Sequence, residues 1–128
     1  MAHRTLLGFR RHADLIRAAR AWYEAAGYTR IFADLPGMRP PRTIQVGANE
    51  ADRPDLTCRD ARNRLIVVEA ETCETVDLME TGLQWRIFRQ YADVAGGEFH
   101  LVVPAECEEQ ARARLASLGI RADRILKF

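Results

Sequence analysis

The sequence contains a single lysine, few cysteines and no long apolar segment. Of its 19 basic residues only Lys127 is a lysine, and the arginines that make up the rest do not deprotonate in proteins. The three cysteines form an odd set without a Cys-x-x-Cys pair, which predicts neither a disulfide framework nor a zinc knuckle. Cys58, Cys73 and Cys107 are therefore interpreted as small core or near-surface thiols. No apolar run approaches the roughly 20 residues of a membrane helix, and no signal-type apolar core follows the first residues, so we expect a cytoplasmic protein without membrane contact.

Length, composition and charge layout predict one globular domain with a basic end. The 128 residues have a mass of 14.6 kDa and are 48% hydrophobic and 29% charged, which is typical of a single domain over residues 1–128. Residues 1–42 contain eight arginines against three acidic residues, which is +5, and because the whole chain carries +1 the remainder carries −4. This asymmetry indicates either a phosphate-binding end or only a compositional bias of the source genome.

Hydrophobic periodicity predicts an α/β protein in the order helix, three strands in a meander, helix, strand, helix. The clearest strand covers residues 64–71, whose continuously apolar middle belongs near the centre of a sheet covered on both faces. Antiparallel hairpins followed by a crossover helix give a central mixed β-sheet flanked by helices. On the long helix we expect the buried stripe at Leu83, Ile87, Tyr91 and Val94. The sequence predicts helices over 12–26, 77–95 and 105–118, strands over 28–33, 54–58, 64–71 and 98–103, an extended stretch at 43–46, a loop at 49–52 and an edge-like segment at 124–127.

Acidic residues stand at the carboxyl end of the predicted central strand. Glu69 and Glu71 alternate with Ala70 and point to one face of the sheet. Antiparallel pairing of the preceding strand brings Asp55 toward their level, because all three lie far from the turn. Like charges in a partly dry cleft have raised pKa values unless a cation relieves them, and Mg2+ prefers carboxylate and carbonyl oxygens. We therefore expect Asp55 and Glu69 to bind Mg2+ or Mn2+; the alternative is that the acids form the solvated tip of a strand.

The element order, together with Pro54-Asp55 and Glu69-Ala70-Glu71, resembles the PD-(D/E)xK superfamily of restriction-endonuclease-like nucleases. The resemblance covers residues 10–118 and implies a restriction-endonuclease-like fold and Mg2+-dependent hydrolysis of phosphodiester bonds, in DNA more than in RNA. It implies that Asp55, Glu69 and the carbonyl of Ala70 bind the metal. By the same resemblance, Glu24 on the first helix is a further acidic residue near the metal, and Gln84 on the long helix faces the phosphate.

Glu71 occupies the position of the family's lysine, which helps to position and activate the attacking water. Some nucleases of the family carry a glutamate there and remain active. Glu71 either accepts a proton from the water or binds a second ion, and it adds negative charge where the phosphodiester approaches. The sequence leaves open a metal-dependent endonuclease, a catalytically silent module of the same fold that binds nucleic acid or a protein partner, and a plain protein-interaction domain with a solvated acidic cluster.

Basic and aromatic side chains on the helices supply the remaining candidates. His100 is expected to be a satisfied core imidazole rather than a base in the cleft, and Trp85 and Phe88 are expected in the core rather than as platforms for base stacking. A nuclease that cuts two strands usually pairs its sites through two-fold symmetry, so we expect a homodimer. The candidates for phosphate contacts, which are otherwise a solvated helix face, are Arg10, Arg11, Arg17, Arg20, Arg86 and Arg89.

Overall fold

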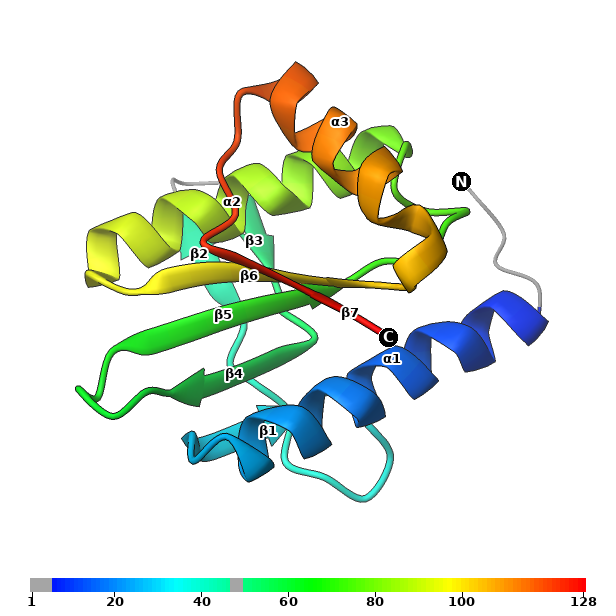
Figure 1. Ribbon diagram of the computed structural model, residues 1–128. Helices are drawn as coiled ribbons and strands as arrows, with labels where there is room; N and C mark the ends of the chain where they lie inside the picture. The colour runs from blue at the N-terminus through cyan, green and yellow to red at the C-terminus, as the bar shows by residue number, and fades with distance from the viewer. Residues whose placement is uncertain (1–5, 47–49) are drawn as a thin grey trace.

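The computed structural model describes residues 6–46 and 50–128, and the side chains of residues 12–45 and 51–128. Its main sheet has five strands in the order β1-β4-β5-β6-β7, and β2 and β3 form a separate two-stranded sheet that packs against α2 (Figure 1). The helices are α1 (Leu6–Ala25), α2 (Met79–Ala95), the 3-10 turn η1 (Ala105–Cys107) and α3 (Glu108–Leu118). The strands are β1 (Thr29–Ala33), β2 (Ile44–Val46), β3 (Glu50–Asp52), β4 (Leu56–Arg59), β5 (Leu65–Ala70), β6 (Glu98–Val103) and β7 (Arg124–Lys127).

The apolar strand β5 lies in the middle of the sheet, as its sequence predicts. It pairs antiparallel with β4, with Leu56 opposite Val68 and Arg59 opposite Leu65. On its other side it pairs parallel with β6, with Ile66 opposite Glu98. β1 pairs antiparallel with β4, so the predicted three-strand meander and the mixed sheet are confirmed.

The helices cover the two faces of the sheet and form a separate core on each. Strand alternation sends Ile66 and Val68 to one face and Val67 to the other. On the first face α1 packs through Leu15, Ile16, Ala19 and Tyr23. On the second face α2 and α3 pack through Trp85, Phe88, Ala92, Ala111 and Leu115, against Val67, Phe99 and Leu101.

The buried stripe of α2 differs from the prediction. Leu83 is 58% exposed and Val94 is 84% exposed, whereas Trp85 and Phe88 are fully buried. α2 carries apolar residues on two adjacent stripes, and the stripe with the aromatic rings removes more apolar surface from water. The core position expected for Trp85 and Phe88 is thus confirmed, and the expected stripe through Leu83 and Val94 is wrong.

Two segments extend beyond the predicted elements. α1 begins at Leu6, before the predicted start at residue 12, and the predicted loop at 49–52 contains β3, whose pairing with β2 places Asp52 opposite Ile44. No helix in the part of the chain that the structure describes is both long and apolar enough to cross a membrane.

Candidate metal centre at the end of the central strand

Three buried acids gather where β5 ends, and we call Asp55, Glu69 and Glu71 the carboxylate cluster. The β4–β5 ladder reaches Leu56 and Val68, so Asp55 stands just beyond the last pair and level with Glu69. The backbone N–H of Asp55 donates to Glu69 Oε1 (3.1 Å), and the N–H of Ala70 donates to Asp55 Oδ2 (2.8 Å). The two side chains thus replace the next rungs of the ladder. Glu69 is only 4% exposed, which argues against the solvated strand tip and against a solvated acidic interaction surface.

Glu71 lies one step past the strand and is held by the fold. Its backbone N–H donates to the carbonyl oxygen of Val102, which continues the pairing with β6 (2.9 Å). Its carboxylate accepts from the Thr75 hydroxyl (2.7 Å) and from the Trp85 indole N–H (3.3 Å). Both oxygens of Glu71 therefore have partners from the α2 side of the sheet.

His12 is a member of the site that the sequence reasoning missed. Its Nε2 lies 3.2 Å from Asp55 Oδ2, and its side chain is 17% exposed. His12 shares the sheet-facing stripe of α1 with Ile16, Ala19 and Tyr23, at helical spacing. The position of His12 on that stripe could have revealed it from the sequence, because an ionisable residue there faces the sheet rather than solvent.

The electrostatics of the cluster disfavour charge on its glutamates. Burial raises the pKa of Glu69 well above its ordinary value of 4.5, and the negative charges of Asp55 and Glu71 raise it further. Burial likewise raises the pKa of Glu71 to about 7; the charge of Asp55 adds to this, while hydrogen bonds from Thr75 and Trp85 and the nearby His12 lower it. A positive charge placed among these carboxylates would relieve the repulsion.

A cation would find its ligands at the pair Asp55 and Glu69 rather than at all three acids. Among the residues that the structure describes, the three-ligand group whose atoms lie within 4.8 Å of one another is Cys73, Glu106 and Cys107, not the carboxylate cluster. Hydrogen bonds of the described residues engage Asp55 Oδ2 and Glu69 Oε1, and the two carboxyl groups also interact with each other through their side chains. These are hard oxygen donors of the kind that Mg2+ and Mn2+ bind.

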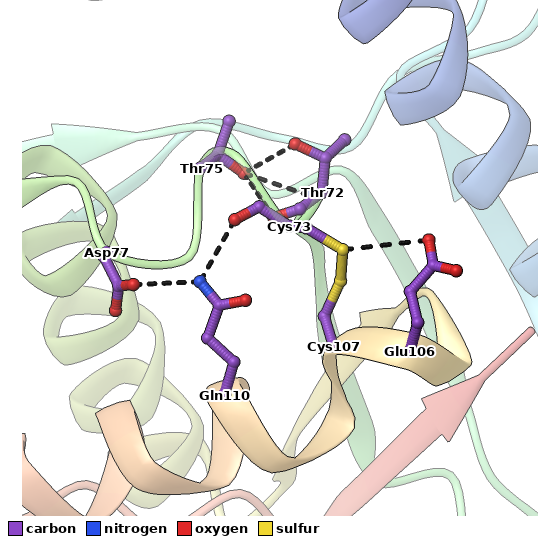
Figure 2. The surroundings of a disulfide bond; sticks show 7 residues. All are labelled: Thr72, Cys73, Thr75, Asp77, Glu106, Cys107 and Gln110. Carbon is purple, nitrogen blue, oxygen red and sulfur yellow. Dashed lines mark hydrogen bonds between the residues drawn. A yellow bond between two sulfur atoms is a disulfide. The ribbon is translucent and has the colours of Figure 1, made fainter.

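A disulfide lies directly beside the cluster, contrary to the prediction of three thiols. Cys73 and Cys107 are joined, with their Cα atoms 5.5 Å apart (Figure 2). The reason is topological: Cys73 follows β5 and Cys107 follows β6, and parallel neighbours end at the same edge of the sheet. Gln110 Nε2 fixes the same loop by donating to the Cys73 carbonyl (3.1 Å) and to Asp77 Oδ2 (2.9 Å). Cys58 remains a free, buried cysteine.

The structure does not bring Glu24 to the cluster, and the expected role of Gln84 at the phosphate stays a prediction. Glu24 lies exposed near the end of α1 and accepts from Arg20 (3.3 Å). His12 and Glu24 are 12 positions apart, which is roughly 18 Å along the helix. The additional acid expected from the first helix is therefore not at this site. Gln84 is half-buried on α2, directly before Trp85, and no hydrogen bond of the described residues joins it to the carboxylates.

Several arginines predicted to contact phosphates are engaged within the fold. Arg17 pairs with Asp14 (3.0 Å), Arg20 pairs with Glu24, and Arg86 donates to the Leu118 carbonyl (3.5 Å). Arg89, whose side chain is 11% exposed, binds Asp93 (2.7 Å) and Asp123 (2.8 Å) and so ties α2 to the segment before β7. The side chains of Arg10 and Arg11 lie outside the described residues.

His100 is a core residue, as expected. The Tyr23 hydroxyl lies 2.6 Å from its Nδ1, and its Nε2 lies 2.8 Å from Glu98 Oε1. Burial lowers the pKa of His100 below its ordinary 6.5, against the opposing effect of Glu98. This arrangement fits a neutral ring that donates from Nε2–H to Glu98 and accepts from Tyr23, which joins α1 to β6.

Comparison of the chain with protein-family models, with curated proteins and with solved structures found no match.

Proposed function

We propose that the chain is a metal-dependent nuclease-like domain that hydrolyses phosphodiester bonds, with DNA favoured over RNA. The observation that carries this proposal is the contact of Asp55 with Glu69 at the carboxyl end of the central strand. The element order supports it: α1, the antiparallel strands β1, β4 and β5, then α2 and the parallel strand β6. This is the arrangement that the PD-(D/E)xK resemblance implies, so a restriction-endonuclease-like fold is part of the proposal.

The donor set fits a hard divalent cation. In the proposal the carboxylates of Asp55 and Glu69 and the carbonyl of Ala70 hold Mg2+ or Mn2+, whose charge offsets the repulsion that raises the pKa of Glu69. When bound, such an ion polarises a phosphoryl oxygen and lowers the pKa of a water molecule. Among the residues whose side chains the structure describes, no arginine forms an ion pair with Asp55, Glu69 or Glu71, and the only lysine, Lys127, pairs with Glu108 on α3 (2.8 Å).

His12 and Glu71 have supporting roles in this proposal. His12 fixes the orientation of the Asp55 carboxylate from the opposite helix layer, at 3.2 Å. Glu71, with its pKa raised to about 7, is the group that can exchange a proton near neutral pH, where general acid–base catalysis is most effective. Its substitution for the family's lysine thus leaves a proton acceptor rather than a fixed positive charge beside the site.

One observation favours the alternative of a catalytically silent module that binds nucleic acid or a protein partner. Both carboxylate oxygens of Glu71 are engaged, with Thr75 and Trp85, so the side chain is built into the fold. A residue that is held in this way contributes to stability whether or not the domain turns over substrate. The two functions differ in cleavage and not in the architecture of the site.

Cleavage of a supercoiled plasmid and of a single-stranded oligonucleotide in Mg2+ or Mn2+ tests the proposal. We expect nicking by the wild type, none in EDTA, and loss of nicking in Asp55→Asn and Glu69→Gln. Glu109→Gln, an exposed acid on α3, is the matched control and should retain activity. If the wild type binds Mn2+ but cleaves neither substrate, the catalytically silent module becomes the better description. Linearisation of the plasmid by cleavage of both strands at one site would indicate that two copies act together, as in the expected homodimer.

A further inference from the structure

A groove of about 570 Å3 lies against β1 and β4 and carries a high density of positive charge. Arg30, Arg39, Arg42 and Arg59 line it, together with Phe32 and Tyr91. Its size is that of a pocket for a small ligand or for part of a larger one. We propose that this groove binds a single-stranded segment of nucleic acid through its phosphates and one or two of its bases.

The charge of the groove is not neutralised by the fold. No acidic residue lines it, and in the described part of the chain none of its four arginines forms an ion pair with a carboxylate. Arg17, Arg20, Arg89 and Arg112, in contrast, all have acidic partners. Four guanidinium groups without a carboxylate partner surround one concave surface, and of these Arg59 donates to the Asn63 carbonyl (3.2 Å). Phosphate oxygens, which bind arginine in a bidentate manner, would relieve the repulsion among these groups.

The backbone and the aromatic rings position the arginines toward a ligand. Arg30 has a positive φ of 50°, at the point where the pairing of β1 with β4 shifts register. Such an irregularity turns a side chain away from the direction that a regular strand would give it. Arg39 lies over the ring of Phe32, at 5.3 Å from its centroid. A guanidinium plane on an aromatic ring forms a flat surface of the kind on which nucleobases stack.

An unpaired strand fits these features better than a duplex. In a duplex the bases are already stacked and paired, so a stacking surface inside a pocket can be used only by an unpaired base. Single-strand sites typically combine such surfaces with a cationic groove along the backbone. The groove therefore has both components of a single-strand site.

The groove and the carboxylate cluster lie on the same face of the sheet. Leu65, which lines the groove, and Glu69 are four residues apart on β5, and strand alternation points both to one face. Four residues of strand span about 13 Å, so the cluster lies within a few nucleotides of a strand held in the groove. The groove is thus placed to hold a strand whose neighbouring phosphodiesters reach the carboxylate cluster. The delivery of phosphodiesters to the cluster rests on the proposed function. Binding of the strand in the groove requires no metal.

Fluorescence anisotropy with a labelled oligothymidine of about 12 nucleotides, in EDTA, tests the groove. We expect Arg39→Ala/Arg42→Ala to weaken binding about tenfold and to reduce the slope of log K against log salt by about 1.4, because two phosphate contacts are lost. Arg30→Gly, which removes the charge but suits a positive φ, should also weaken binding and keeps the test valid if the double variant folds poorly. Arg112→Ala/Arg121→Ala, on exposed arginines that have acidic partners, is the charge-matched control.

Three results would overturn the inference. The first is unchanged affinity for the oligothymidine in both groove variants. The second is an equal loss of affinity in Arg17→Ala/Arg20→Ala or in the control variant. The third is that the protein binds a duplex, or polyglutamate, as tightly as it binds the single strand. Glu69→Gln separates the groove from the proposed chemistry, because it should retain binding in EDTA. Binding that depends on the groove without any cleavage rejects only the hydrolysis, and cleavage without such dependence rejects only the groove.

Discussion

Without added metal ions, the protein should lose stability as Glu71 ionises. Its pKa rises from 4.5 in an unfolded chain to about 7 in the fold, so the folded state binds the proton more tightly. The contribution of Glu71 to stability is fully present below pH 4.5 and is lost as the pH rises to about 7, because unfolding then releases a charge that the interior disfavours. At about 1.4 kcal/mol for each tenfold change, this pKa difference corresponds to about 3 kcal/mol in the free energy of unfolding.

The surroundings of Glu71 can accommodate either protonation state. The Thr75 hydroxyl donates to the ionised carboxylate (2.7 Å), and it also lies 3.3 Å from the carbonyl oxygen of Thr72. When Glu71 is protonated, that hydroxyl can turn toward Thr72 and accept the new proton, while the Trp85 N–H keeps its acceptor. Glu71→Gln therefore mimics the protonated state without a steric change, and it should remove the pH dependence that Glu71 contributes rather than the fold.

Urea unfolding in EDTA, followed by tryptophan fluorescence between pH 4.5 and 8, measures the effect. Across this window the free energy of unfolding of the wild type should fall by about 3 kcal/mol relative to that of Glu71→Gln. The raised pKa of Glu69 acts in the same direction, because the negative charge of Glu71, which helps to raise it, is absent from the variant. Glu109→Gln should follow the wild type. Parallel profiles for the wild type and Glu71→Gln would show that the burial of Glu71 does not carry the free energy assigned to it.

Three further predictions follow from other parts of the structure. Reduction of the Cys73–Cys107 disulfide, which closes a loop of 34 residues, should lower the free energy of unfolding by about 4 kcal/mol, and Cys73→Ser should show the same loss without reductant; equal stability in both redox states would contradict this. A Cβ at Gly97 would overlap the carbonyl oxygen of Leu65, so Gly97→Ala should cost about 3 kcal/mol in urea unfolding, and a loss below about 1 kcal/mol would mean that the chain relaxes there. Saturating Mn2+ should raise the melting temperature of the wild type, with little effect on the Asp55→Asn/Glu69→Gln double variant, because a ligand of the folded state stabilises by mass action.

Local sequence patterns predicted the sheet well because strand β5 and its turns are specified by neighbouring residues. The apolar run of β5 predicted a central strand, and the level of Asp55 relative to Glu69 followed from counting residues from the turn at Asp60–Asn63. The buried stripe of α2 could not be chosen from periodicity, because Trp85 and Leu83 begin two neighbouring stripes. Only the packing against Phe99 and Leu101 decides between them.

Contacts between distant segments could not be predicted from the sequence, because local patterns do not show which segments pack together. The pairing of Cys73 with Cys107, which are 34 positions apart, depends on β5 and β6 being parallel neighbours, and the sequence between the cysteines contains no sign of it. His12 reaches Asp55 across 43 residues, because α1 runs past the end of the sheet. Glu24, which was expected near the metal, sits on the exposed side of the same helix, so the sequence predicted the helix but not which of its ionisable residues faces the cluster.

The proposed function requires that Asp55 and Glu69 together bind a divalent cation. A crystal structure of the wild type soaked in Mn2+, with the anomalous signal of manganese recorded, tests this requirement. We expect an anomalous peak within coordination distance of the carboxylates of Asp55 and Glu69, and we expect the peak to be lost in Glu69→Gln. Absence of a peak at these carboxylates under saturating Mn2+, or a peak that persists there in Glu69→Gln, would contradict it.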